Sequence, residues 1–144
     1  MKITITCFIL VLMSITSAVA QEKYFASSKE AKDFSVKCST LFKENKLNDF
    51  FKELRAYWPL PENEIGSLED KTIQYMNLLK DRFGATEGVV KIKEEVISDF
   101  AIKETYILRF ENSAVRLIYV YYKNKKGWVI NMFKWDDSFT EEFK

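Results

Sequence analysis

The change of hydrophobic period near Gly88 constrains the fold of this chain more than any other feature. Before Gly88, apolar residues recur every three or four positions, as on one face of an amphipathic helix. After it, they alternate with polar residues, as in a strand with one buried side. Helices followed by strands, with no linker or repeat between them, predict a single α+β domain.

Three helices are expected in the first part of the chain. Their predicted ranges are 28–43, 48–58 and 67–83. Ser27 and Glu30 have the spacing of a capping box at the start of the first helix. Pro59 ends the second helix because proline has no amide hydrogen to donate. Ser67 opens the third helix and Gly84 is its natural stop.

Four strands are expected in the second part, joined by short turns. Their predicted ranges are 88–96, with a bulge near Glu94, then 103–111, 115–123 and 128–135. A two-residue turn at Asn112 and Ser113 joins the second strand to the third, and a looser turn containing Gly127 joins the third to the fourth. Strands connected in this way are antiparallel, so we expect a meander packed on the three N-terminal helices.

The predicted turn sets a register for the two central strands. Leu108 then faces Leu117 and Tyr106 faces Tyr119, on a nearly apolar side that we assign to the core under the helices. We call this side the core face and the opposite side the open face. Each residue's face follows from its place in the alternation.

The stretch from Tyr119 to Phe133, with the step Gly127-Trp128, resembles the closing hairpin of the NTF2-like (cystatin-like α+β cone) superfamily, especially its small exported domains. This resemblance implies a curved, conical sheet that encloses a pocket against the helices. It also implies frequent homodimerisation through the sheet and a mixture of enzymes and binding domains. The enzymes include isomerases and dehydratases that use aspartate, tyrosine or histidine. None of their site patterns aligns with this chain, so the resemblance implies a fold and no activity.

A carboxylate and three tyrosines share the core face. In the predicted register Glu104 lies across from Tyr121, beside Tyr106 and Tyr119. Hydroxyl groups beside a carboxylate inside an apolar cone could bind a small ligand or hold an oxyanion. The alternative is that the rings are buried and the hydroxyls are hydrated at the rim of the sheet. These four residues are the candidate pocket.

The open face carries more hydrophobic residues than is usual for a sheet face exposed to water. The predicted register pairs Ile107 with Ile118 and sets two cations, Arg109 and Arg116, directly opposite each other, which destabilises a sheet unless acids lie nearby. A face of this kind needs cover from the C-terminal segment, a second subunit or another protein. The candidate interface residues on this face are Ile107, Arg109, Arg116, Ile118, Val120, Tyr122 and Phe133.

The acidic C-terminal segment, residues 136–144, is one source of such cover. Its acids are spaced somewhat like those of a calcium loop, but it lacks the glycine on which that loop turns. We expect a short turn that docks through Phe139 and Phe143, with its acids near Arg116.

Residues 1–20 have the pattern of a secretory signal peptide. A charged start and a short apolar run lead to Ala18 and Ala20, the small residues expected before cleavage at Gln21. An uncleaved membrane anchor is the alternative, but the apolar run is short for a bilayer span. We expect residues 21–144 to form one exported domain, periplasmic or secreted, without a stable membrane anchor.

Composition excludes several classes of function. Lys2 is the only charged residue of the leader, so 21 of the 22 basic residues remain beside 21 acidic ones, and this balance indicates no binding of nucleic acid. The chain has no histidine, which removes histidine-dependent catalysis and most zinc and copper sites. Cys38 is the single cysteine after the leader and is predicted to be buried in a helix. No metal or cofactor is expected.

These observations predict a non-catalytic binding protein. It would form a homodimer or contact a periplasmic protein through the open face, or hold a small apolar ligand in the cone. The alternative is a cofactor-free isomerase or dehydratase that uses Glu104 with a pocket tyrosine.

Overall fold

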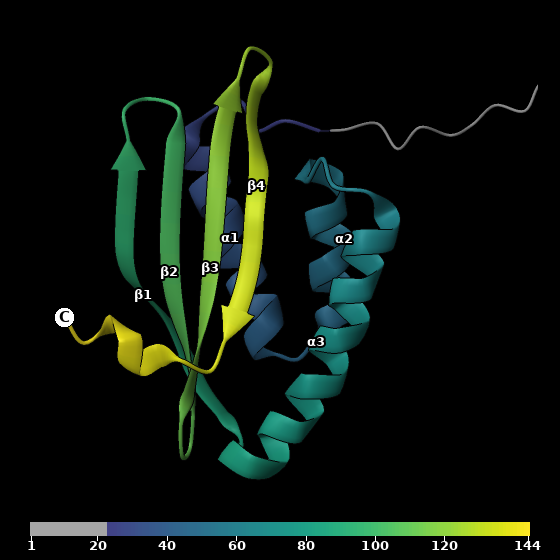
Figure 1. Ribbon diagram of the computed structural model, residues 1–144, viewed down its shortest axis with the longest axis vertical. Helices are drawn as coiled ribbons and strands as arrows, with labels where there is room; N and C mark the ends of the chain where they lie inside the picture. The colour runs from purple at the N-terminus through teal and green to yellow at the C-terminus, as the bar shows by residue number, and fades with distance from the viewer. Residues whose placement is uncertain (1–22) are drawn as a thin grey trace, which may run out of the picture.

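The computed structural model describes residues 23–144; the expected leader and its cleavage before Gln21 lie outside the described residues. Three helices precede four strands and a short 3-10 helix. Their bounds are α1 Ser28–Lys43, α2 Leu47–Tyr57, α3 Glu62–Phe83, β1 Thr86–Ile97, β2 Ala101–Phe110, β3 Ala114–Asn124, β4 Gly127–Asp136 and η1 Phe139–Glu142. The sheet is an antiparallel meander in the order β1-β2-β3-β4. The predicted α+β class, three helices on a curved four-stranded sheet, is confirmed (Figure 1).

The helices follow their local signals except at the start of α3. Ser27 Oγ accepts a hydrogen bond from the Glu30 amide at 3.2 Å, and the Glu30 carboxylate accepts one from the Ala26 amide at 2.9 Å. This reciprocal capping begins α1 where it is predicted. The predicted start of α3 at Ser67 is wrong, because the helix begins directly after Pro61. Proline has no amide hydrogen for a helix end to leave unpaired, so it suits this position.

The register between β2 and β3 differs by two residues from the predicted one. Leu108 faces Val115 and Arg109 faces Ala114, so the predicted opposition of Arg109 and Arg116 is wrong. Side chains alternate with a period of two, so a shift of two residues keeps each one on its predicted face. The faces of β2 and β3 are therefore confirmed, while the pairs across them change.

A tertiary contact of the β2–β3 turn explains this shift. The central turn residues are Glu111 and Asn112, because the Phe110 amide donates to the Ser113 carbonyl at 2.8 Å. The amides of Glu111 and Asn112 donate to carbonyls around the α3–β1 connection. Gly84 lies in that connection with a φ of +86°, and a Cβ there would come within 2.1 Å of Glu111 Oε2. Contact with the α3–β1 connection thus determines which residues form the turn. No local sequence pattern indicates this contact.

A bulge in β4 moves Phe133 to the core face. The pairing skips Asn131, so Val120 faces Met132 while Tyr121 faces Ile130. One extra residue sends all later side chains of the strand to the other face. Phe133 is 3% exposed and faces Tyr119, so its predicted place on the open face is wrong.

The edge strand β1 also contains a bulge. Its register shifts between Lys91 and Lys93, so the irregularity lies at Ile92 and not near Glu94 as predicted. The bulge and the charged residues around it blunt an exposed strand edge against pairing with other chains.

The hydrophobic core fills the space between the helices and the core face. Cys38 of α1 is fully buried, as predicted, and burial raises the pKa of its thiol. Aromatic rings dominate the centre of the core; they include Phe42, Phe50, Phe51, Tyr119 and Phe133. Within residues 23–144, no helix combines the length and the apolar character needed to cross a membrane.

Candidate functional site on the two sheet faces

The four candidate pocket residues meet on the core face, beneath α1. Glu104 faces Tyr119, and not Tyr121 as predicted, because of the register shift. Glu104, Tyr119 and Tyr121 have no exposed surface, and Tyr106 is 4% exposed. The structure brings these residues together and separates them from solvent.

The Glu104 carboxylate is fully engaged by its neighbours. Tyr106 donates its hydroxyl to Oε2 at 3.0 Å, and Ser35 donates its hydroxyl to Oε1 at 3.3 Å. Lys91 of β1 forms an ion pair with Oε2 at 2.8 Å. A buried carboxylate needs such partners because its charge would otherwise be strongly destabilised.

Two serines of α1, absent from the sequence-based candidates, complete this cluster. Ser35 Oγ lies 2.5 Å from the Tyr121 hydroxyl, and Ser39 Oγ lies 3.0 Å from the Tyr119 hydroxyl. The two serines are four residues apart on the buried side of the helix. Polar residues at that spacing on an apolar helix face are a signal that could have identified them.

The tyrosines of the cluster are held in their neutral form. Burial raises the pKa of Tyr119 and Tyr121. Burial also raises the pKa of Tyr106, and the nearby Glu104 charge adds to this effect. At neutral pH neutral hydroxyl groups therefore surround the Glu104–Lys91 ion pair. This arrangement ties α1 to the sheet.

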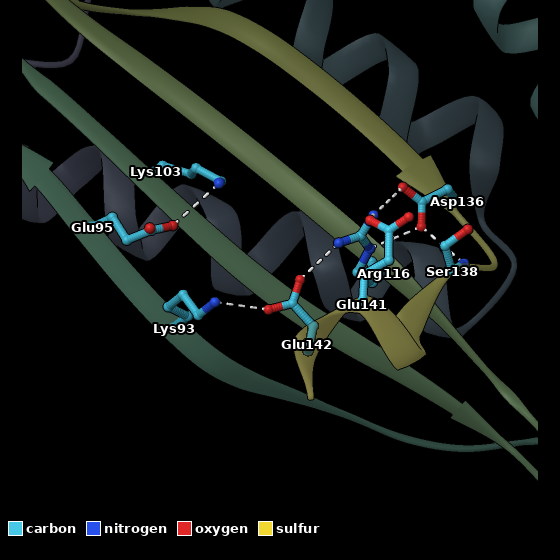
Figure 2. Close-up of polar contacts among 8 residues, drawn as sticks. All are labelled: Lys93, Glu95, Lys103, Arg116, Asp136, Ser138, Glu141 and Glu142. Atoms are coloured by element: carbon cyan, nitrogen blue, oxygen red, sulfur yellow. Dashed lines mark hydrogen bonds and ion pairs between the residues drawn. The ribbon is translucent and has the colours of Figure 1, made fainter. Parts of the chain in front are cut away.

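On the open face, Arg116 of β3 gathers three carboxylates. Its Nε and Nη2 atoms donate to the two oxygens of Asp136, each at 2.8 Å. Nη2 also donates to Glu141 at 2.9 Å, and Nη1 donates to Glu142 at 2.7 Å. Glu142 in turn binds Lys93 of β1 at 2.9 Å, as Figure 2 shows. The prediction that C-terminal acids lie near Arg116 is confirmed.

Arg116, Asp136 and Glu142 are charged at neutral pH. Burial opposes ionisation of Asp136, but hydrogen bonds from Arg116 and the Ser138 amide outweigh it and lower its pKa. Hydrogen bonds from Lys93 and Arg116 lower the pKa of Glu142. The same acids, Asp136 foremost, raise the pKa of Arg116. Across residues 23–144, no group of three or more metal-ligating side chains is placed to hold a metal ion.

The C-terminal segment covers one half of the open face. Ile118 and Thr105 lie between Lys93 and Arg116, and they are 3% and 1% exposed. Glu142 at the end of η1 contacts both cations (Figure 2). We infer from these contacts that η1 covers Thr105 and Ile118. Ion pairs hold this segment in place, and the predicted docking of Phe143 is wrong because its side chain is 80% exposed.

No segment from residues 23–144 covers the other half of the open face in this way. Ile97, Ala101 and Tyr122 form one row across three strands, and Phe100 packs on Tyr122 with ring centroids 6.0 Å apart. Ile97 is 64% exposed, Tyr122 45% and Phe100 41%. A hollow of about 310 Å³ next to this row includes Val120 in its lining. We call these residues the apolar patch: Ile97, Phe100, Ala101, Val120 and Tyr122.

The structure separates the predicted interface residues into distinct environments. Val120 and Tyr122 belong to the apolar patch, whereas Arg116 and Ile118 lie under the C-terminal segment. Ile107 is half-buried, and Arg109 is exposed and lies 3.4 Å from Glu87. Ile97 and Phe100 were not predicted, because both lie at the end of the β1–β2 hairpin, outside the predicted strands.

Comparisons with known proteins give one structural likeness. No family model matches the chain, and no curated protein matches it either. A crystal structure from Thiobacillus denitrificans, named for the calcium/calmodulin-dependent protein kinase type II association domain, is similar over 79% of this chain and 97% of that one. The sequence identity is 15% and the TM-score is 0.47. A likeness of this extent carries no information about function.

Proposed function

We propose that this chain is a non-catalytic protein-binding domain of NTF2-like fold, and that its contact surface is the apolar patch. The observation that carries this proposal is the exposure of Ile97, Phe100 and Tyr122 side by side on a sheet face. Contiguous apolar surface of this kind is typical of a protein interface. The ion pair between Lys103 and Glu95, 3.2 Å apart, supplies a polar rim beside it.

The core face gives less support to a ligand pocket or an enzyme. Glu104 is fully buried, and its oxygens already interact with Tyr106, Ser35 and Lys91. A general acid or base must reach the atom that gains or loses the proton. A substrate would have to displace these partners before it could meet the carboxylate, so the cluster is better suited to a structural role.

The partner would be met outside the cytoplasm. Export rests on the signal-peptide pattern of residues 1–20, and the NTF2-like assignment rests on the order of elements and the curved meander. A periplasmic or secreted protein, or a second copy of this chain, would then contact the patch.

Comparative capture tests the proposal. The mature domain is immobilised and exposed to an extract of the compartment to which it is exported. Two variants are treated in the same way: Ile97→Glu and the control Val36→Glu. Val36 is 56% exposed on α1, away from the sheet. We expect one protein to be retained by the parent and by the control but lost from Ile97→Glu, and to bind again when purified. Equal retention by all three would contradict a role for the patch.

A further inference from the structure

A second hollow lies between α3 and the end of β4. It measures about 290 Å³ and is lined by Tyr75, Leu79, Trp135, Asp136 and Asp137. None of these residues belongs to the apolar patch or to the Glu104 cluster. Two aromatic rings and two carboxylates therefore meet around one small space.

The aromatic walls of this hollow are held in fixed positions. Trp135 donates its indole Nε1–H to Thr72 Oγ1 at 3.0 Å, and Thr72 is 1% exposed on α3. The rings of Tyr75 and Trp135 lie edge to face, with centroids 6.4 Å apart and an angle of 69° between planes. Tyr75 nevertheless remains 57% exposed. A rigid indole and an accessible phenol ring can receive a ligand without rearrangement.

The charge around the hollow favours a cation. Asp136 is engaged by Arg116, but Asp137 has no ion pair or hydrogen bond with any residue from 23 to 144. Two carboxylates, Asp136 and Asp137, line the hollow, and no cationic side chain is among the residues that line it.

We propose that this hollow binds an organic cation, an alkylammonium or guanidinium group, held against Tyr75 and Trp135 and beside Asp137. The electron-rich faces of aromatic rings attract cations, and Trp is the strongest of them. An anion would be repelled by the two carboxylates that line the hollow, and a neutral apolar group would gain no electrostatic attraction from them. This site is independent of the protein contact proposed for the apolar patch.

Choline and its neutral analogue 3,3-dimethyl-1-butanol, which have nearly the same shape, test the role of charge. Each is titrated into the mature domain while the Trp135 indole N–H is followed by NMR. We expect a saturable shift with choline and affinity about fivefold tighter than for the alcohol. Equal affinity, or no shift with choline, would overturn the proposal.

A blocked arginine amide, titrated in the same way, distinguishes two sources of the cation. Tighter binding of choline supports a free small ligand, and tighter binding of the arginine amide supports a basic side chain of another protein. Both outcomes support recognition of a cation at this place.

Substitutions test whether choline binds in this hollow. Tyr75→Ala should weaken choline binding severalfold, whereas Leu78→Ala, at a site 63% exposed on the same helix and outside the hollow, should leave it unchanged. Asp137→Asn should reduce the affinity for choline toward that for the alcohol, with the alcohol unaffected. Choline binding that survives both Tyr75→Ala and Asp137→Asn would overturn the assignment.

Discussion

The two halves of the open face differ in what covers them, although both belong to the same antiparallel sheet. Around Arg116 the chain's own C-terminal segment lies on the sheet, held by three carboxylates. Around Tyr122, the part of the chain that the structure describes leaves the surface bare. The covered half presents Arg116 and Lys93 to an acidic segment, whereas Lys103, a cation beside the bare half, already pairs with Glu95. The segment reaches the half beside the end of β4 at Asp136, and charge complementarity holds it there.

The largest expected difference in stability is between two variants, each of which places a carboxylate on one half of the open face. Ile118→Glu should lower the free energy of unfolding by about 3 kcal/mol or more, because the new charge would be buried beneath η1 next to Glu142. Tyr122→Glu should cost under about 1 kcal/mol, because the site is exposed. Urea denaturation measures both values. Similar losses for the two variants would show that the halves do not differ in cover.

Removal of the cation that holds the segment should have the next largest effect. Arg116→Met should lower the free energy of unfolding by roughly 2 kcal/mol, since three acids lose their common partner. Arg109→Met is the matched control, because Arg109 is exposed and its single contact is long. Its effect should stay within about 0.5 kcal/mol. If the two arginines contribute equally, the Arg116 cluster does not stabilise the protein.

Removal of the segment itself should have a moderate effect. A chain that ends after Asp137 loses η1 and uncovers Ile118, which should reduce the free energy of unfolding by about 1–2 kcal/mol. Faster hydrogen exchange should follow on the central part of β3, while amides near Tyr122 keep their rates. The control is Phe143→Ala, which should change nothing because that ring is 80% exposed. Unchanged exchange around Ile118 in the shortened chain would contradict cover by η1.

Acid should release the segment without altering the patch. The pKa values of Asp136 and Glu142 are lowered in the folded protein, so their stabilising contribution is complete above the ordinary values of 3.8 and 4.5. It is lost as the pH falls through the lower values of the folded state. Carboxyl carbon NMR should give a Glu142 midpoint below 4.5, and Arg116→Met should raise this midpoint. A midpoint at or above 4.5 in the parent protein would contradict the ion pairs.

Alternation of side chains in β2 and β3 was enough to predict which residues face the core, and the capping residues around Ser27 were enough to place α1. The register could not be predicted, because the turn at Glu111 is selected by its contact with the α3–β1 connection. The place of Phe133 depends on the bulge at Asn131, for which the sequence carries no clear signal.

The candidate sites, like the fold, could be predicted only in part from the sequence. The grouping of Glu104 with three tyrosines follows from strand alternation, but the closure of that group depends on Ser35 and Ser39, which come from a distant helix. The attraction of the C-terminal acids to Arg116 follows from charge. The area of the sheet that the segment covers could not be predicted in this way, because it depends on where η1 crosses the sheet.

Photo-crosslinking in the producing cell tests the central claim most directly. A benzophenone amino acid is placed at position 122 in the apolar patch and, as a control of similar exposure, at position 36 on α1. We expect a discrete adduct with one protein, or with a second copy of the chain, only from position 122, and its loss when Ile97→Glu is added. Adducts of equal yield from both positions, or none from position 122, would contradict the proposal that the bare half of the open face is a binding surface.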